Sequence, residues 1–122
     1  MRNPMRPYWK PGESLTAHAK TAVTGRRFVD LDGPRVDGNP QVSHKAGDAI
    51  GVAAYDAPAG EKVTIYLGGV LEVQAVAALT AGAYVKPDAT GQAIAAASKA
   101  ESVGRAIDDI AAGGTGPINF GR

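Results

Sequence analysis

The sequence contains no cysteine, and its aromatic residues are limited to one Trp, four Tyr and two Phe among 122 residues. Without cysteine the chain forms neither a disulfide nor a thiolate metal site, so stability beyond packing has to come from assembly. No apolar run approaches the roughly 20 residues that cross a bilayer, and no apolar signal core opens the chain. These absences predict a soluble, intracellular product that does not associate with membranes.

The residues that are present predict an ordered chain with a thin core. Hydrophobic residues make up 44% of the sequence, and Ala and Val supply most of them. The 16 glycines and 8 prolines recur between short apolar runs at turn-like spacings, which indicates order and not low complexity. The length suits one domain. We therefore expect a single compact domain over residues 14–122, preceded by a segment of different composition at 1–13.

Short alternating runs predict strands. Leu15, Ala17 and Ala19 fall on one side of a period-2 pattern whose other side is polar, which is typical of a half-exposed strand. Similar runs, separated by Gly, Pro and Asp, occupy residues 27–31, 41–43, 49–54, 62–67, 70–73 and 83–87. This spacing predicts an all-β fold, a small β-barrel or β-sandwich. The Ala-rich stretches 76–81 and 93–100 form at most short helices, and residues 88–91 favour a hairpin turn.

An internal repeat is present. Residues 51–68 align without a gap over residues 104–121 with seven identities, and a weaker match upstream extends the copies to about 24–68 and 80–121. In each copy an Asp, Asp56 or Asp109, is placed to accept backbone N–H bonds in a turn, and a following Gly, Gly60 or Gly113, is suited to a positive φ. Chance alignment of Ala- and Gly-rich stretches is the alternative. The repeat predicts two related β-units that close into one small barrel or sandwich, with these turns at equivalent corners.

The sequence offers no catalytic or metal-binding constellation. His18 and His44 have no triad partners, their spacing matches no compact zinc pattern, and both are expected on the solvated surface. Asp30, Asp32 and Asp37 lack the Glu of a calcium loop and indicate a turn with Asx hydrogen bonds. The glycine pairs are not followed by the Lys-Ser/Thr of a phosphate loop. We therefore predict a protein that is not an enzyme and holds no cofactor or metal.

Residues 1–13 form a distinct basic segment, termed here the arm. It holds three prolines, which favour an extended chain, together with Arg2, Arg6, Tyr8, Trp9 and Lys10. Residues 1–27 sum to a charge of +5 and the remainder to −4. Such an arm could bind nucleic acid, with the basic side chains on the phosphates and an aromatic ring stacked on a base. It could equally bind an acidic protein surface, with Trp9 as an anchor in a pocket. The absence of a second basic stripe disfavours direct nucleic-acid binding, and a tail without a partner is the remaining alternative.

Several runs together resemble a known family. They are YWKPGE at 8–13, AVTGRRFV at 22–29, GVAAYDA at 51–57, GEKVT at 60–64 and GGV at 68–70. In order and spacing they resemble the small head-decoration proteins, also called cement or minor capsid proteins, of tailed bacteriophages, particularly those infecting actinobacteria. The resemblance implies a β-rich oligomer, often a trimer, made in the host cytoplasm. It further implies attachment to the outer face of the capsid, where the major capsid protein is the partner.

A function of another class remains open at this stage. A β-rich adhesion or carbohydrate-binding module, displayed on a virion or a cell surface, needs exposed aromatics in a shallow groove. Tyr55, Tyr66 and Tyr84 are the candidates for that role. Tyrosines at the strand positions 66 and 84 also suit a core or an interface between subunits.

Overall fold

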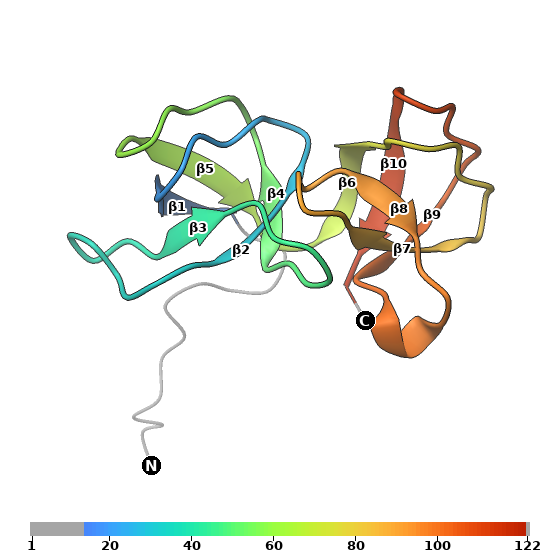
Figure 1. Cartoon of the computed structure of the whole chain (residues 1–122), viewed down its shortest axis with the longest axis horizontal. Helices are drawn as coiled ribbons and strands as arrows, with labels where there is room; N and C mark the ends of the chain where they lie inside the picture. The colour runs from blue at the N-terminus through green and yellow to red at the C-terminus, as the bar shows by residue number, and fades with distance from the viewer. Residues whose placement is uncertain (1–13, 122) are drawn as a thin grey trace, which may run out of the picture.

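Ten short strands make up nearly all of the regular structure within residues 14–121 (Figure 1). The computed structural model describes residues 14–121. The strands are β1 (Ser14–Ala19), β2 (Phe28–Leu31), β3 (Gln41–Ser43), β4 (Gly51–Ala53), β5 (Lys62–Tyr66), β6 (Gly69–Gln74), β7 (Tyr84–Pro87), β8 (Ala93–Ala95), β9 (Gly104–Ala106) and β10 (Thr115–Phe120). Among the described residues the only helix is the 3₁₀ turn η1 (Lys99–Glu101). The predicted all-β fold class is confirmed.

The first unit, residues 14–67, is by itself a closed barrel with the strand order β1-β3-β2-β4-β5, and the second unit forms a separate sheet. Contrary to the prediction from the repeat, the two units therefore do not close together into one barrel, because β1 finds both of its partners within its own unit. Strand β1 closes it by pairing antiparallel with β5, from Ser14–Tyr66 to His18–Lys62, and parallel with β3. The predicted alternation in β1 is confirmed, because Leu15, Ala17 and Ala19 are buried inside the barrel. Closure leaves neither β1 nor β5 as a free edge.

The second unit, residues 69–121, repeats this connectivity. Its sheet has the order β6-β10-β9-β7-β8, in which β6 to β10 have the neighbours of β1 to β5. The parallel contact between β1 and β3 has its counterpart in a single bridge between Ala75 and Ala93. Ser14 pairs with Tyr66, and Val70 with Asn119, so β1 corresponds to β6 at an offset of 56 and β5 to β10 at 53. The structural correspondence therefore begins at Ser14 and Val70, earlier than the sequence alignment.

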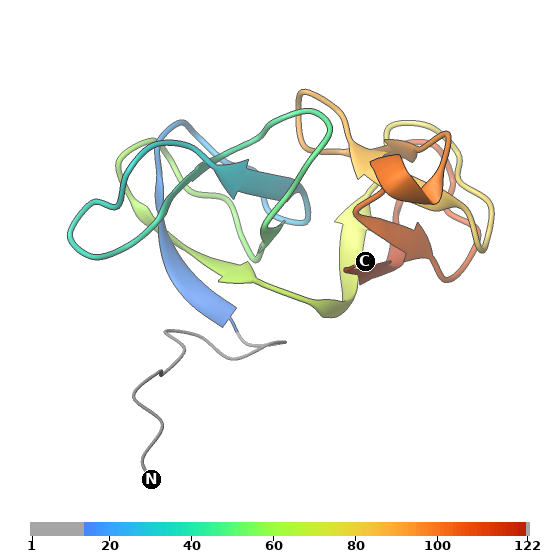
Figure 2. The same cartoon turned by 90° about the horizontal axis from the view of Figure 1, so that it is seen from below.

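The two units lie side by side (Figures 1 and 2). They also share buried side chains. The first barrel has its own small core of Ala, Val, Leu and Ile. Phe28 and Val52 belong to the first unit but pack into the core of the second, where the Phe28 ring lies 5.8 Å from that of Phe120. The junction is thus apolar at its centre, and burying a side chain such as Phe28 contributes about 3 kcal/mol.

Hydrogen bonds frame this apolar contact. The amide of Phe28 donates to the carbonyl of Gly91, and the amide of Gln74 donates to the carbonyl of Arg26, both at 2.8 Å. The Arg27 Nε donates to the Gln74 Oε1 at 3.0 Å. These bonds join the two units next to their shared core and help to hold them in one orientation.

The Ala-rich stretches are not α-helical. Ala93–Ala95 form β8, which makes a hairpin with β7, as residues 88–91 predict. The Asp88 carboxylate closes this turn by accepting hydrogen bonds from the amides of Thr90 and Gln92 at 2.9 and 3.0 Å. None of the helical structure in residues 14–121 has the length or apolar character to span a bilayer.

Candidate functional site

The arm enters the fold beside the junction of the two units. Arg2, Arg6, Tyr8, Trp9 and Lys10 lie outside the described residues, so their role as partner-binding residues stays a prediction. The first described residue, Ser14, pairs with Tyr66, three residues before the start of β6 at Gly69. The arm therefore joins the body near the point where the chain passes from the first unit to the second.

Asp56 and Asp109 hold equivalent corners of the two units. The Asp56 Oδ1 accepts a hydrogen bond from the amide of Gly25, and the Asp109 Oδ1 accepts one from the amide of Ala81, each at 2.8 Å. The donors are distant in sequence, so each carboxylate links two loops of its unit and does not simply close a local turn. Both side chains are exposed, and each uses one carboxylate oxygen for this structural contact.

Gly60 and Gly113 also occupy matching places. Their φ values are +88° and +76°, a backbone conformation in which side chains other than hydrogen are strained. Each donates its amide to the end of the first strand of its unit, Gly60 to Ala19 and Gly113 to Ala75, at 2.7 and 2.8 Å. These glycines set the path of the chain into β5 and β10.

His44 is not the solvated surface residue that its polar surroundings in sequence indicate. Its Nε2 accepts a hydrogen bond from the amide of Thr24 at 2.9 Å, and its Nδ1 lies 2.8 Å from the carbonyl of Phe28. The pattern requires the neutral ring with its proton on Nδ1, which donates to Phe28. The half-buried imidazole therefore ties a loop to β2 and has a structural role. His18 lies half-buried on the outward side of β1.

The surroundings of His44 favour the neutral ring. Burial lowers the pKa of His44 below its usual value, and the positive charge of Arg27 lowers that pKa further. The Phe28 carbonyl and the Asp88 carboxylate act in the opposite direction. Gly91 packs so closely on the ring that a side chain there would overlap Nδ1. A second proton on Nε2 would remove the acceptor that the Thr24 amide uses.

Acidification is expected to destabilise the protein through His44. The pKa of His44 in the folded protein lies below its unfolded value of about 6.5. The neutral ring therefore makes its full contribution to the free energy of unfolding above about pH 6.5, and this contribution is lost as the pH falls through the folded pKa. Thermal melts from pH 7.5 to 5 should show a decline that His44→Gln flattens, at a cost of about 1 kcal/mol at pH 7.5 for the altered hydrogen bonds. His18→Gln is the matched control and should keep the decline. An equal decline in His44→Gln would contradict this assignment.

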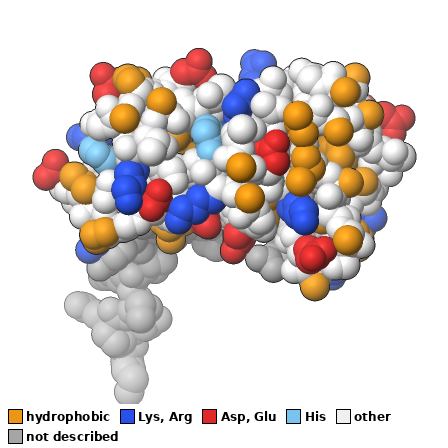
Figure 3. Space-filling model, in the orientation of Figure 1, with side chains coloured by type: hydrophobic (Ala, Val, Ile, Leu, Met, Phe, Trp, Pro, Cys, Tyr) orange, Lys and Arg blue, Asp and Glu red, His pale blue; other side chains and the backbone are white. Residues whose placement is uncertain are grey.

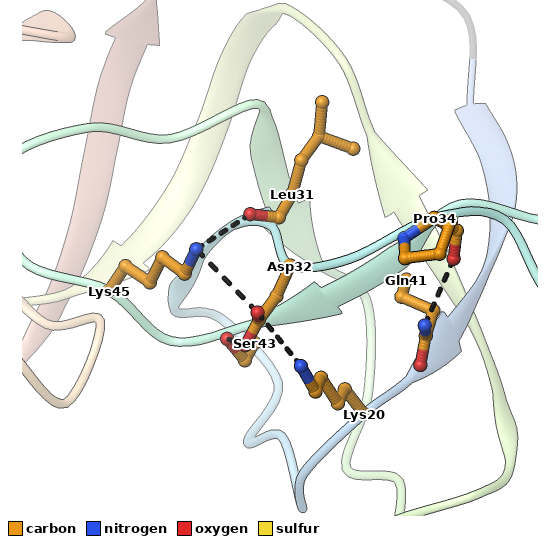
Figure 4. A network of polar contacts seen from close by, with 7 residues as sticks. All are labelled: Lys20, Leu31, Asp32, Pro34, Gln41, Ser43 and Lys45. Carbon is orange, nitrogen blue, oxygen red and sulfur yellow. Dashed lines mark hydrogen bonds and ion pairs between the residues drawn. The ribbon is translucent and has the colours of Figure 1, made fainter.

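Asp32 is the centre of a polar network on the first unit and not part of an Asx turn (Figure 4). Its Oδ2 accepts from the Ser43 hydroxyl at 2.7 Å, and its Oδ1 lies 3.2 Å from the Lys20 ammonium and 3.7 Å from that of Lys45. The Ser43 hydrogen bond, followed by that from Lys20, lowers the pKa of Asp32. Both carboxylate oxygens of Asp32 thus contact donor groups of the protein itself. Within residues 14–121 no three carboxylates or imidazoles gather into a metal site.

The three tyrosines considered for glycan binding have different surroundings. Tyr55 and Tyr66 are exposed by 50% and 44%, whereas the Tyr84 ring is covered by the Arg105 guanidinium, 4.8 Å from the ring centre. No ring contact joins the three rings within the described part of the chain. On the face drawn in Figure 3, hydrophobic side chains gather over the second unit, and Lys and Arg lie mainly over the first unit and the junction.

A groove at the junction is the feature that the sequence does not reveal. It has a volume of about 230 Å³, and its apolar lining includes Tyr66, Val70 and Leu71, with Arg26 and Glu72 beside them. The alternation in β5 signals that Tyr66 faces outward, opposite Val63 and Ile65. Nothing local predicts that β6 turns its first residues toward the same space, because the groove exists only where the two units meet.

Comparisons with known proteins agree with this architecture. The family model described as phage cement protein matches residues 9–121. Among solved structures, the chain is similar to the N base of the head fiber protein gp8.5 of bacteriophage phi29, with a TM-score of 0.72 and 23% identity. That likeness covers 88% of this chain and 92% of the other, and it supports the fold. Among curated proteins no match is found. The family match spans both units and the last residues of the arm.

Proposed function

Because the chain belongs to the phage cement protein family, we propose that it decorates the outer surface of a phage head and stabilises the lattice of the major capsid protein. The family makes the chain a structural component of a phage virion. The match over residues 9–121 is the observation that carries the proposal. The expected activity is therefore binding without turnover.

The body of the protein suits a rigid bridge. Its two units share an apolar junction, and hydrogen bonds to the carbonyls of Gly91 and Arg26 join the units there. A rigid body loses little conformational entropy on binding, so more of the contact energy appears as affinity. A pair of small barrels held in one orientation can span neighbouring subunits of a shell.

The arm supplies the attachment in this proposal. Arg2, Arg6 and Lys10 provide charge for an acidic neighbouring surface, and Tyr8 and Trp9 provide aromatic anchors. The region 28–122 of each copy carries a net charge of −4, so sister copies are also suitable neighbours. We propose that the protein works as an oligomer, a trimer, whose arms contact the capsid or a sister copy.

Stabilisation follows from mass action. A ligand that binds the assembled, expanded shell but not its separated subunits stabilises the shell by RT ln(1 + [L]/Kd) per site. This amounts to about 2.7 kcal/mol at a hundredfold excess over Kd, and a shell offers many sites. Numerous modest contacts thereby resist the pressure of packaged DNA.

The test uses capsids of the same phage assembled without this protein. We expect the purified chain to cosediment with expanded capsids at saturating stoichiometry and to raise their melting temperature, while unexpanded shells bind less of it. Electron microscopy should then show added density on the outer face. Absence of binding to expanded capsids would overturn the proposal.

A further inference from the structure

The groove at the junction is an apolar surface that the body leaves uncovered. Tyr66 and Val70 are exposed by 44% and 58%, although both are large hydrophobic residues. Leu71 is half-buried and lines the groove from the second unit. Its volume of about 230 Å³ is below the roughly 300 Å³ at which pockets for small molecules begin. A space of this size suits one or two side chains of a peptide segment.

The strand register places the start of β1 beside this groove, because Ser14 pairs with the groove residue Tyr66. Strand β1 runs antiparallel to β5, with Leu15 opposite Ile65 and Ser14 opposite Tyr66. Residues before Ser14 that continue in this direction pass beside residues 67–70, the chain that leads from β5 into β6. The family match also begins at residue 9 and not at Ser14, so the last five residues of the arm belong to the matched unit.

The reach of the arm is sufficient. Trp9 lies five residues before Ser14, and an extended chain of that length spans up to about 17 Å. A segment tethered so closely has an effective concentration in the millimolar range at the groove. At micromolar protein concentration the arm of the same chain therefore has the advantage over the arm of a second copy.

The chemistry of the groove matches an indole. Tyr66, Val70 and Leu71 offer apolar contact to its ring. The guanidinium of Arg26 suits the face of an aromatic ring, and the carboxylate of Glu72 suits its N–H or a nearby ammonium such as that of Lys10. The groove is too small for a typical small-molecule ligand. A second copy of the protein lacks the tether that holds the arm of the same chain close to the groove.

We propose that, in the protein free of a capsid, this groove binds the arm of its own chain, with Trp9 packed against Tyr66, Val70 and Leu71. This docking goes beyond the proposed function and does not depend on it. The same aromatic side chain is then sheltered until a partner surface competes for it. The free protein thereby hides an apolar residue that would otherwise promote association.

Trp9 is the only Trp of the sequence, so its fluorescence reports on the groove directly. We expect blue-shifted emission and protection from acrylamide in the isolated full-length protein, independent of its concentration. Val70→Asp should shift the emission to longer wavelength and raise the quenching constant about twofold, since the indole is released to water. Val76→Asp is the matched control, because Val76 is 47% exposed outside the groove, and it should behave as the wild type.

Circular dichroism of both variants checks that each is folded. Emission typical of a solvated indole in the wild type would overturn the proposal, as would an unchanged spectrum in folded Val70→Asp. Protection that appears only with rising protein concentration would overturn it in favour of the groove of a second copy. None of these fluorescence measurements uses a capsid. A negative result would therefore contradict docking of the arm in the groove without bearing on the proposed decoration function.

Discussion

Replacing Gly104 by alanine is expected to lower the free energy of unfolding by about 3 kcal/mol, because the new Cβ would overlap the carbonyl oxygen of Asn119. The neighbouring atoms are backbone of β10, paired with β9 through Asn119–Arg105 and Phe120–Gly104, and they cannot move without opening the ladder. Gly51 has the same place in the first unit, where a Cβ would overlap the carbonyl oxygen of Tyr66. Thermal and urea unfolding of Gly104→Ala and Gly51→Ala measure the loss.

Gly60→Val and Gly113→Val provide the comparison. A Cβ at either position meets no atom within 4 Å, so only the positive φ is unfavourable. These variants should fold and lose about 1–2 kcal/mol each. If Gly104→Ala were as stable as Gly113→Val, close packing at β9 would not be the limiting constraint. An unchanged melting point in Gly60→Val would contradict the role given to the turn.

Removing residues 1–12 is expected to abolish attachment to capsids while the body stays folded. All ten strands and both cores lie within residues 14–121, so the truncated chain keeps the interactions that stabilise it. It loses Arg2, Arg6 and Lys10, whose charges favour encounter with an acidic surface, and both aromatic anchors. Cosedimentation with expanded capsids measures binding, and circular dichroism measures folding.

Point variants separate the two contributions of the arm. Trp9→Ala should weaken binding by 2 kcal/mol or more, about thirtyfold in Kd, if the indole fills a partner pocket. Reversal of Arg2 and Arg6 to Glu should act mainly on the rate of association and its salt dependence. Full binding by the truncated protein would contradict attachment through the arm, and its unfolding would contradict the division at residue 13.

The strands were predictable because each unit depends on local patterns. Alternation in β1 identifies Leu15, Ala17 and Ala19 as inward residues, and the glycines and prolines between runs mark the turns. The choice between barrel and sandwich was not predictable, since it depends on whether β1 pairs with both β3 and β5. These contacts join residues far apart in sequence, on which local periodicity carries no information.

The features missed by sequence reasoning all arise from contacts between distant segments. His44 lies in a polar stretch of the sequence, yet its ring nitrogens form hydrogen bonds with the backbone of Thr24 and Phe28. Strands β1 and β6 share only Leu15/Leu71 and Ala19/Ala75, because β6 lies at the junction and its outward residues meet different neighbours. The groove likewise depends on the junction. The arm, by contrast, is recognisable from composition, and its contacts stay a prediction.

The stacked pair of Tyr84 and Arg105 makes one face of the second unit different from the matching face of the first. By the offsets of the repeat, these residues stand where the first unit has Phe28 and Val52, the apolar side chains that fasten it to the second. The charged guanidinium over the ring makes that surface polar. Such a surface is unsuited to pack against another barrel as Phe28 and Val52 do. We therefore expect this face of one molecule not to join a neighbouring molecule in the way that Phe28 and Val52 join the two units.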